Sequence, residues 1–409
     1  MKKIVVNGGK RLCGDVVVSG SKNAALPIIF SCILTNGVSE IENLPDIGDV
    51  RVALSIISSL GAKVEKRGMK TYIDTRDLSY FSPDAELVSE IRASTYLIGS
   101  CLSRFGRCPI MSFGGCNFSL RPIDMHIDAC AALGAKLVDG LLIANGLRGA
   151  KIKFRQASVG ATVNAILLSV SAEGESLISG CAVEPHIDAL IEFLVSCGAD
   201  IHRFGRELRI KGKALHGGKI KIIGDMIEAG SYLAVGAISG GSLRLIDAPI
   251  DDMCEIISSV ERLGAEIKIT GGDMIVKGSD SLGHTSVVAS PHPGFPTDLQ
   301  PIIAPLMAAG EGGRITDNVW QTRFGYLKSL SNFGVEYDLV KNSAFIYPSK
   351  ITNGQTIATD LRGGMACLVA ALYSKGQSVI GSADLILRGY EKLEEKLCTI
   401  GADIKIYDY

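Results

Sequence analysis

A short glycine motif recurs six times along the 409-residue chain, and it constrains the fold more than any other feature. In each copy an apolar residue, a glycine and a small residue end an amphipathic stretch. The copies are Leu60-Gly61-Ala62, Leu133-Gly134-Ala135, Cys197-Gly198-Ala199, Leu263-Gly264-Ala265, Phe333-Gly334-Val335 and Ile400-Gly401-Ala402. Glycine ends helices readily because it adopts the left-handed backbone conformation without steric cost. Six copies at intervals of 64 to 73 residues predict six equivalent units.

Each unit is also expected to contain a second helix, because a stretch rich in Ala, Gly and Ser recurs between the copies. These stretches begin near Lys22, Arg92, Ser158, Glu228, Asp298 and Asp360. Short apolar runs such as Ser242–Leu245 predict strands, so each unit should read strand, helix, strand, helix, strand, strand. The pattern leaves open one ring of six units or two groups of three. Converging N-termini of the second helices would form a site for anions.

The two chain ends are expected to complete one unit. The sixth copy stops at Ile404-Lys405-Ile406 without its last strands, and residues 3–20 resemble residues 208–224 of the third unit. The predicted boundaries therefore fall near Ser21 and Gly224. They give one domain of residues 22–223 and a discontinuous domain of residues 1–21 and 224–409.

The charge balance excludes a broad electrostatic attraction to nucleic acid or anionic lipid. The chain has 42 Lys and Arg residues against 43 Asp and Glu residues, a net charge of -1. A phosphorylated ligand would therefore need a local cluster of basic residues. The sequence also shows no signal peptide, no membrane-spanning run and no feature that requires a protein partner.

Cysteine and histidine usage indicates a reducing, cytoplasmic compartment without a bound metal. The 11 cysteines lack CxxC pairs, which argues against a secreted disulfide framework. The six histidines lack ligand spacing such as HxH or HExxH. We expect neither a metal nor an organic cofactor.

Two motifs place reactive side chains at loops. In Ser19–Pro27, Lys22 and Asn23 lie where a strand enters a helix, so Lys22 either binds phosphate or is solvated. In the second motif, paired glycines precede Cys116, and Arg121 follows five residues later. A nearby guanidinium lowers the pKa of a thiol, which favours a reactive Cys116 over an inert buried one.

Acidic and basic residues recur where helices begin. Asp298 follows a proline-rich loop, and from the residues alone a helix N-cap is favoured over a general base. Arginines stand at comparable junctions, and their planar forks match carboxylate and phosphate groups. A shared anionic target is therefore indicated for Arg92, Arg121, Arg323, Arg362 and Arg388.

Six motifs in order along the chain resemble those of the UDP-N-acetylglucosamine 1-carboxyvinyltransferase (MurA) family of enolpyruvyl transferases. They are SGSKNAALP, GGCxxxxRPID, SVGAT, HPxFPTD, TDLR and RGYE. The resemblance runs from end to end and implies an inside-out α/β barrel. This fold has two domains, each with three βαβαββ repeats related by pseudo-threefold symmetry, and a cleft that closes on the nucleotide sugar.

The resemblance also implies an activity. The enolpyruvyl group of phosphoenolpyruvate would pass to the 3-hydroxyl of UDP-N-acetylglucosamine with release of phosphate. This reaction is the first committed step of peptidoglycan synthesis, and the family is the target of the epoxide fosfomycin. No cofactor is implied.

Roles follow by matched position. Asp298 would remove the proton of the sugar hydroxyl and Cys116 would protonate the methylene carbon, while Lys22, Arg121 and Arg388 would hold phosphoenolpyruvate. Arg323 and Arg362 would surround its charges, and Asp360 would also lie in the substrate site. The UDP-sugar would contact Asn23, Arg92, Arg121, Pro122, Ile123, Asp124, Met125, Ser158, Val159, Gly160, Asp298 and Val319.

Departures from the family pattern leave alternatives. Gln156 stands where the family usually has Lys, and Met226 where it usually has Arg. Either change could accompany a different hydroxyl acceptor or a non-catalytic paralogue that binds a UDP-sugar. A repeat scaffold such as a DNA clamp is a further alternative, but the near-zero charge argues against it.

Overall fold

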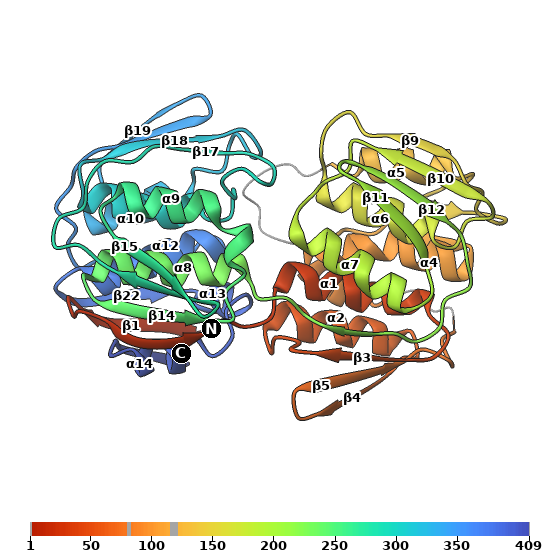
Figure 1. Cartoon of the computed structure of the whole chain (residues 1–409), viewed down its shortest axis with the longest axis horizontal. Coiled ribbons are helices and arrows are strands. Elements are labelled where there is room, and N and C mark those ends of the chain that lie inside the picture. The colour runs from red at the N-terminus through yellow and green to blue at the C-terminus, as the bar shows by residue number, and fades with distance from the viewer. Residues whose placement is uncertain (1, 80–82, 115–121, 409) are drawn as a thin grey trace. The chain divides into compact units, whose positions relative to one another are not determined.

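The computed structural model describes residues 2–79, 83–114 and 122–408 of the chain (Figure 1). These residues form two compact units. One contains the described residues of 1–19 and 224–409, and the other contains those of 20–223. Within the described residues, the chain passes between the units at Ser19–Gly20 and at Ile223–Gly224.

The unit of residues 20–223 alternates helices and strands. Its helices are α1 (Lys22–Ser31), α2 (Gly48–Ser59), α3 (Ala85–Glu90), α4 (Leu97–Phe105), α5 (Asp124–Ala132), α6 (Val159–Ser169) and α7 (Pro185–Ser196), with 3-10 turns η1 (Cys32–Leu34) and η2 (Arg92–Tyr96). Its strands are β3 (Val38–Glu42), β4 (Lys63–Arg67), β5 (Lys70–Asp74), β6 (Arg107–Pro109), β7 (Lys136–Val138), β8 (Leu141–Ile143), β9 (Lys151–Lys153), β10 (Glu175–Ser179), β11 (Asp200–Phe204), β12 (Glu207–Lys211) and β13 (Lys219–Lys221).

The unit that contains both chain ends has the same alternation. Its helices are α8 (Met226–Ser239), α9 (Cys254–Arg262), α10 (Gln300–Ala309), α11 (Tyr326–Leu330), α12 (Leu361–Tyr373), α13 (Asp384–Leu387) and α14 (Leu393–Thr399), with 3-10 turns η3 (Ile250–Asp252) and η4 (Ser331–Phe333). Its strands are β1 (Lys2–Gly8), β2 (Cys13–Val17), β14 (Ser242–Ile246), β15 (Glu266–Thr270), β16 (Asp273–Lys277), β17 (Val287–Ala289), β18 (Gly313–Asp317), β19 (Tyr337–Val340), β20 (Ser343–Ile346), β21 (Gln355–Ile357), β22 (Gly376–Gly381) and β23 (Asp403–Asp408).

Five sheets formed by the described strands share one topology. A parallel pair is extended by an antiparallel pair of strands, which is a hairpin in four of these sheets and consists of β1 and β23, from the two chain ends, in the fifth. The orders are β13-β3-β5-β4, β9-β10-β12-β11, β2-β14-β16-β15, β17-β18-β20-β19 and β21-β22-β1-β23. A sixth sheet has the three strands β6-β8-β7 in the described part of the chain. The recurring order confirms the predicted repeat of two helices and four strands.

The six predicted helix-ending glycines all adopt positive φ angles. Their φ values lie between 83° and 103° for Gly61, Gly134, Gly198, Gly264, Gly334 and Gly401. Residues with a Cβ rarely adopt this conformation, so glycine is the residue that ends each helix at the least cost.

The chain ends join two different sheets. β1 pairs with β22 and β23, with Ile4 opposite both Ile380 and Ile406, so it completes the sheet of the sixth repeat as predicted. The expectation that the whole segment 3–20 fills that one unit is wrong for β2. β2 pairs in parallel with β14 in the fourth repeat, because β13, the strand that directly precedes α8 in the chain, pairs with β3 and leaves the position beside β14 to β2. β12 and β13 divide between two sheets in the same way.

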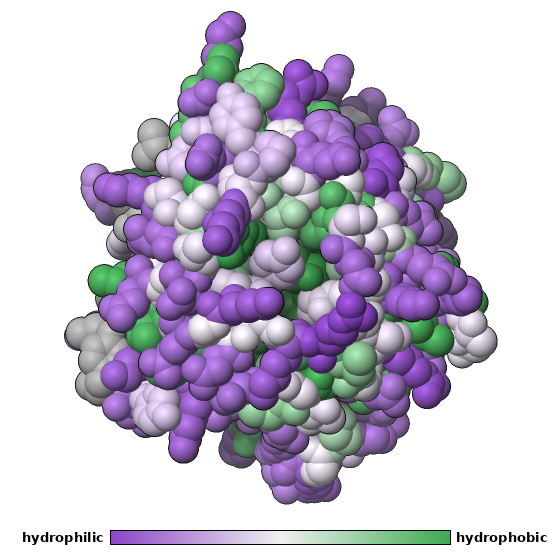
Figure 2. Space-filling model, turned by 90° about the vertical axis from the view of Figure 1, so that its left-hand side faces the viewer, coloured by the Kyte–Doolittle hydropathy of each residue, from purple (hydrophilic) through white to green (hydrophobic). Residues whose placement is uncertain are grey.

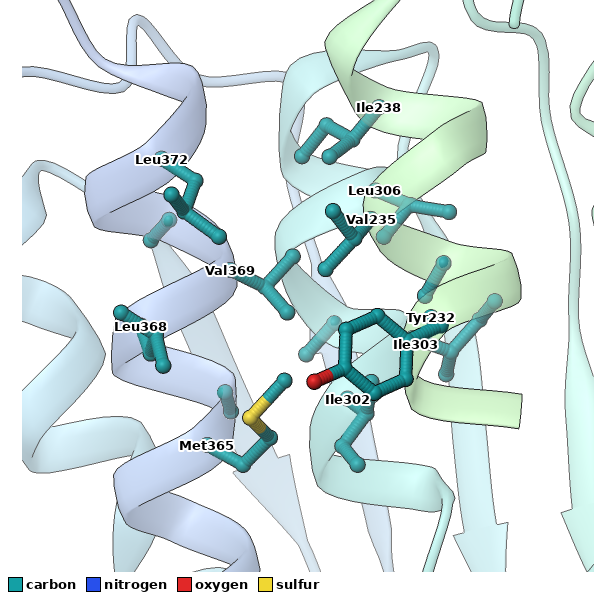
Figure 3. Packing of buried hydrophobic residues seen from close by; sticks show 14 of the residues in the cluster. Tyr232, Val235, Ile238, Ile302, Ile303, Leu306, Met365, Leu368, Val369 and Leu372 are labelled. Carbon is teal, nitrogen blue, oxygen red and sulfur yellow. The ribbon is translucent and has the colours of Figure 1, made fainter. Parts of the chain in front are cut away.

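Helices occupy the centre of each unit and sheets lie outside them. In Figure 3, α8, α10 and α12 pack side by side through Val235, Leu306 and Val369, all of which are fully buried. Strand residues alternate between this core and solvent; in β14, for example, Leu243 is buried and Arg244 is exposed. This is the predicted inside-out arrangement. The described strands form separate sheets and no closed barrel.

Small residues let the central helices approach their neighbours closely. A Cβ on Gly230 of α8 would lie 2.6 Å from Cδ1 of Leu299, and one on Gly236 would lie 2.6 Å from Cγ1 of Val276. A side chain at either position would require the side chain of Leu299 or Val276 to shift. The observed Gly and Ala content is therefore a packing requirement. In the described part of the chain, none of the helices combines the length and apolarity needed to cross a bilayer.

Replacing Leu306 by Ala should destabilise the unit that contains both chain ends. Leu306 is fully buried between the central helices, so the substitution leaves a cavity and should cost about 2–5 kcal/mol. Urea unfolding can be followed by the fluorescence of Trp320, the single tryptophan of the chain. Leu339→Ala, at a position 49% exposed, is the matched control. Equal unfolding midpoints for the two variants would contradict the central position of Leu306.

Candidate active site

Asp298 lies at the centre of a charged cluster in the unit that contains both chain ends. Its carboxylate accepts hydrogen bonds from Nη1 of Arg323 at 2.6 Å and from Nε of Arg362 at 3.2 Å. The side chains of Arg323 and Arg362 are 5% and 3% exposed, whereas that of Asp298 is 29% exposed. The carboxylate therefore faces solvent while its two partners are fixed behind it.

The capping interpretation of Asp298 is wrong. Helix α10 begins at Gln300, and its N-cap Leu299 makes no side-chain capping bond. Asp298 instead holds the two guanidinium groups. Among the described helices of this unit, the N-caps with a capping carboxylate are Asp225 on α8 and Asp360 on α12, each of which accepts bonds from two backbone N–H groups.

Arg323 is held by a chain of buried polar side chains. Gln300 is fully buried, donates to the backbone carbonyl of Arg323 at 2.7 Å and accepts from the hydroxyl of Tyr326 at 2.6 Å. Asp317, also fully buried, accepts from the hydroxyl of Thr297 at 2.6 Å, and Nη1 of Arg323 donates to the same hydroxyl at 3.3 Å. These bonds fix the guanidinium group before any ligand arrives.

Arg362 keeps its positive charge in an enclosed position. Its guanidinium carbon lies 5.3 Å from the ring centre of Tyr390. Burial alone would lower its pKa, whereas Tyr390, Asp298 and Asp225 raise that pKa above its ordinary value. Nη2 of Arg362 is buried and has no hydrogen-bond partner among the described residues. A charged donor of this kind indicates a place for a further acceptor.

Arg388 and Val319 belong to the same unit. Arg388 follows α13 and is half-buried, two residues before Tyr390. Val319 is half-buried, and its backbone N–H donates to Oδ1 of Asp317 at 2.8 Å. The carboxylate that positions Thr297 therefore also fixes the loop that carries Val319.

A buried ion pair anchors the segment that leads to Lys22. Nζ of Lys396 lies 2.8 Å from Oε1 of Glu228 and donates to the hydroxyl of Ser19 at 2.6 Å. The other Glu228 oxygen accepts from the backbone N–H of Ser19 at 2.5 Å, and the Ser19 carbonyl accepts from the N–H of Asp225 at 2.9 Å. Burial raises the pKa of Glu228, and Lys396 opposes that rise. Ser19 is thus bound through all three of its polar groups.

Lys22 lies in the other unit, at the first position of α1. Its Nζ is 3.3 Å from Oδ2 of Asp49, and the two side chains are 14% and 9% exposed. Of the two interpretations offered for Lys22, phosphate binding or a solvated side chain, the second is therefore wrong. Ser21 caps the helix by accepting from the N–H of Ala24, and Asn23 is half-buried beside it.

Three segments expected to bind the UDP-sugar meet around one histidine in the unit of residues 20–223. His126 directly follows Asp124 and Met125, and Arg92 and Asp124 both act on its pKa. Its ring also lies against Gly160 of the Ser158–Gly160 segment. Asp124 forms an ion pair with Arg155. Pro122 is exposed, Ile123 is half-buried, and Cys116 and Arg121 lie outside the described residues.

Comparisons with known proteins agree with this layout. A profile of the EPSP synthase (3-phosphoshikimate 1-carboxyvinyltransferase) family matches residues 6–397. The UDP-N-acetylglucosamine 1-carboxyvinyltransferase 3 of Caldanaerobacter subterraneus is 40% identical over 412 residues, covering 99% of both chains. The UDP-N-acetylglucosamine 1-carboxyvinyltransferase of Prosthecochloris aestuarii is 37% identical over 420 residues, covering 100% of this chain and 99% of that one. The chain belongs to the UDP-N-acetylglucosamine 1-carboxyvinyltransferase family.

Solved structures show the fold of this family member. The enolpyruvyl transferase NikO from Streptomyces tendae superimposes with a TM-score of 0.89 at 24% identity, covering 99% of this chain and 98% of that one. EPSP synthase from Acinetobacter baumannii gives a TM-score of 0.74 at 18% identity with full coverage of both chains. The recurring sheet topology is therefore the enolpyruvyl transferase fold.

The starts of the three central helices converge in the unit that contains both chain ends. Asp298 precedes α10 and contacts Arg362 in the first turn of α12, and Asp225 at the start of α8 acts on the same guanidinium. The convergence that the repeat pattern suggested is confirmed here. Such a site can bind a small anion, since it combines fixed guanidinium donors with helix N-termini. No group of three potential metal ligands occurs in the described parts of the chain.

Several positioning residues were not identified from the sequence. Asp317, Gln300 and the pair Glu228 and Lys396 all stabilise the cluster from behind. Glu228 and Lys396 are 168 residues apart, and no local pattern connects them. For these residues, the one sequence feature that pointed to a role near the site was the position of Glu228 at the start of a predicted central helix.

Replacing Lys396 by Met should strongly destabilise the unit, because the buried Glu228 carboxylate then loses its counter-charge. We expect a loss of about 3–5 kcal/mol in the free energy of unfolding, measured by urea unfolding. The double variant Lys396→Met with Glu228→Gln should lose less than the sum of the single variants. Lys268→Met removes an exposed pair with Glu266 and is the control, with little expected effect. Additive losses would argue against coupling between the two residues.

Proposed function

We propose that this chain transfers the enolpyruvyl group of phosphoenolpyruvate to the 3-hydroxyl of UDP-N-acetylglucosamine and releases phosphate. This is the first committed step of peptidoglycan synthesis and would take place in the cytoplasm. The observation that carries the proposal is the Asp298 carboxylate, partly exposed and fixed by the two buried guanidinium groups of Arg323 and Arg362. Full-length relatives named for this reaction support it.

Asp298 is the proposed general base. Its exposed edge would accept the proton of the sugar hydroxyl, and the oxygen would then attack C2 of the enol ester while C3 gains a proton. The tetrahedral ketal that results would then lose a proton from C3 and release phosphate, which restores the double bond between C2 and C3. Because Asp298 is held by two hydrogen bonds, little reorganisation is needed during the proton transfer.

The arginines are proposed to stabilise charge. The centre that develops at C2 lies between a carboxylate and a phosphate group, so cations fixed in advance lower the barrier. Arg323, Arg362 and Arg388 are proposed for this task, and the roles of Lys22 and Arg121 rest on the family resemblance and stay predictions. The assignment of Cys116 as the acid that protonates C3 rests on the family resemblance and stays a prediction.

Phosphate release gives a direct test of the reaction. The purified chain should release phosphate from phosphoenolpyruvate only when UDP-N-acetylglucosamine is present, and fosfomycin should alkylate Cys116. The adduct can be located by mass spectrometry of a digest. Turnover with another hydroxyl compound, and none with the UDP-sugar, would favour the alternative acceptor that Gln156 and Met226 suggest. Binding without turnover would indicate the non-catalytic paralogue.

Replacing Asp298 by Asn should abolish most of the turnover. The amide keeps the shape of the side chain but cannot accept a proton, so kcat should fall by about 100-fold or more. The dissociation constant for UDP-N-acetylglucosamine, measured by calorimetry, should change much less than kcat. Asp317→Asn is a useful comparison, since it should disturb the position of Thr297 and Arg323 without removing the base. A kcat for Asp298→Asn close to that of the unaltered chain would exclude the proposed base.

A further inference from the structure

His126 is a buried polar residue that the proposed reaction does not use. It lies on α5 with 5% of its surface exposed, and Asp124 is two residues before it. Its side chain contacts α6 through two residues. Nδ1 lies 2.7 Å from Nδ2 of Asn164, and the ring lies against Gly160.

Asn164 determines which nitrogen of His126 carries the proton. Oδ1 of Asn164 accepts from the backbone N–H of Gly99 at 2.7 Å, so this atom is the amide oxygen. Nδ2 donates to the carbonyl of Thr95 at 3.1 Å, which confirms the orientation of the amide. Nδ2 must therefore donate to Nδ1 of His126 as well. A neutral imidazole that accepts at Nδ1 carries its hydrogen at Nε2.

The protonated edge of His126 faces the N-terminus of α6. A Cβ on Gly160 would lie 2.9 Å from Cε1 and 3.0 Å from Nε2 of the ring. Within residues 2–79, 83–114 and 122–408, Nε2 has no hydrogen-bond partner. Ser158 caps α6 by accepting from the N–H of Ala161. The N–H groups of Val159 and Gly160 precede that capping bond, so they belong to the unsatisfied donors of a helix start.

The charges around the His126 ring favour a neutral imidazole, which can donate a hydrogen bond to a bound anion. Burial and the positive charge of Arg92 lower the pKa of His126 to about 4, and Asp124 opposes that shift. Asp124 itself is paired with Arg155. His126 should therefore remain neutral, with its donor in place, throughout the physiological pH range. Arg92 and the start of α6 supply positive potential at the same place.

We propose that His126 donates a hydrogen bond from Nε2 to a phosphate oxygen of the nucleotide diphosphate, in a tautomer fixed by Asn164. This inference rests on the proposed function, because it assumes that a UDP-sugar binds at Ser158–Gly160. His126 would then be a positioning residue that binds the diphosphate with a neutral side chain. Gly160 belongs to the same arrangement, because any Cβ there would displace the ring.

Binding of UDP and of uridine separates a diphosphate contact from a general structural role. His126→Phe keeps most of the volume but removes the donor, so UDP should bind about tenfold more weakly, measured by calorimetry. Uridine, which lacks the phosphates, should bind as it does to the unaltered chain. His126→Gln retains a donor and should recover part of the UDP affinity. His202→Phe, at an exposed position on β11, is the control.

Nitrogen-15 NMR of the imidazole tests the tautomer independently. The unaltered chain should show a protonated Nε2 and an unprotonated Nδ1 between pH 6 and pH 8, and the Nε2 resonances should shift when UDP is added. A proton on Nδ1 would overturn the inference, as would equal losses of UDP and uridine affinity. Normal UDP affinity in His126→Phe would overturn this inference alone. Failure of the unaltered chain to bind UDP would overturn the proposed function with it.

Discussion

Close packing of small-residue helices at the centre of each unit is the constraint on which the remaining structure depends. Helices α8, α10 and α12 pack through buried aliphatic residues, and glycines on α8 let neighbouring elements approach (Figure 3). Since the helices fill the centre, the sheets must lie outside with one face in solvent. The face of the molecule seen in Figure 2 is largely hydrophilic, with hydrophobic residues scattered over it. The same packing brings the helix starts together, and the candidate residues lie at those starts. Binding chemistry is therefore located where the geometry of the repeat already supplies polar backbone groups.

Much of the fold could be predicted because its signals are local. Each of the six glycines indicates a left-handed backbone conformation at its own position, and each stretch of small residues predicts a tightly packed helix. The position of β1 could also be predicted from the sequence, since the sixth repeat lacks its last strand and another segment must complete its sheet. The position of β2 was not, because β13 directly precedes α8 in the chain and would be expected beside β14, whereas β13 pairs with β3 and β2 takes that place.

The site was less accessible from the sequence, and Asp298 shows why. Its residue type and its place before a helix favour capping, yet its carboxylate pairs with arginines 25 and 64 residues away. Local preference cannot reveal such pairs, because their formation depends on how distant segments pack within this one unit. The contact between Asn164 and His126 could not be predicted from the sequence either. The tautomer of the imidazole can be assigned only when the orientation of the buried amide beside it is known.

The division of the terminal strands between two sheets has a consequence for synthesis on the ribosome. Residues 20–223 form a unit whose strands are all available once Ile223 has emerged. The segment before Gly20 is made before that unit, but its partners β14, β22 and β23 are all made after it. Two strands with exposed edges must therefore wait while about half of the protein is translated, and they are open to wrong pairing during that interval. Strand β1 therefore reaches its partners β22 and β23 only after residues 20–223 and most of the second unit have been made.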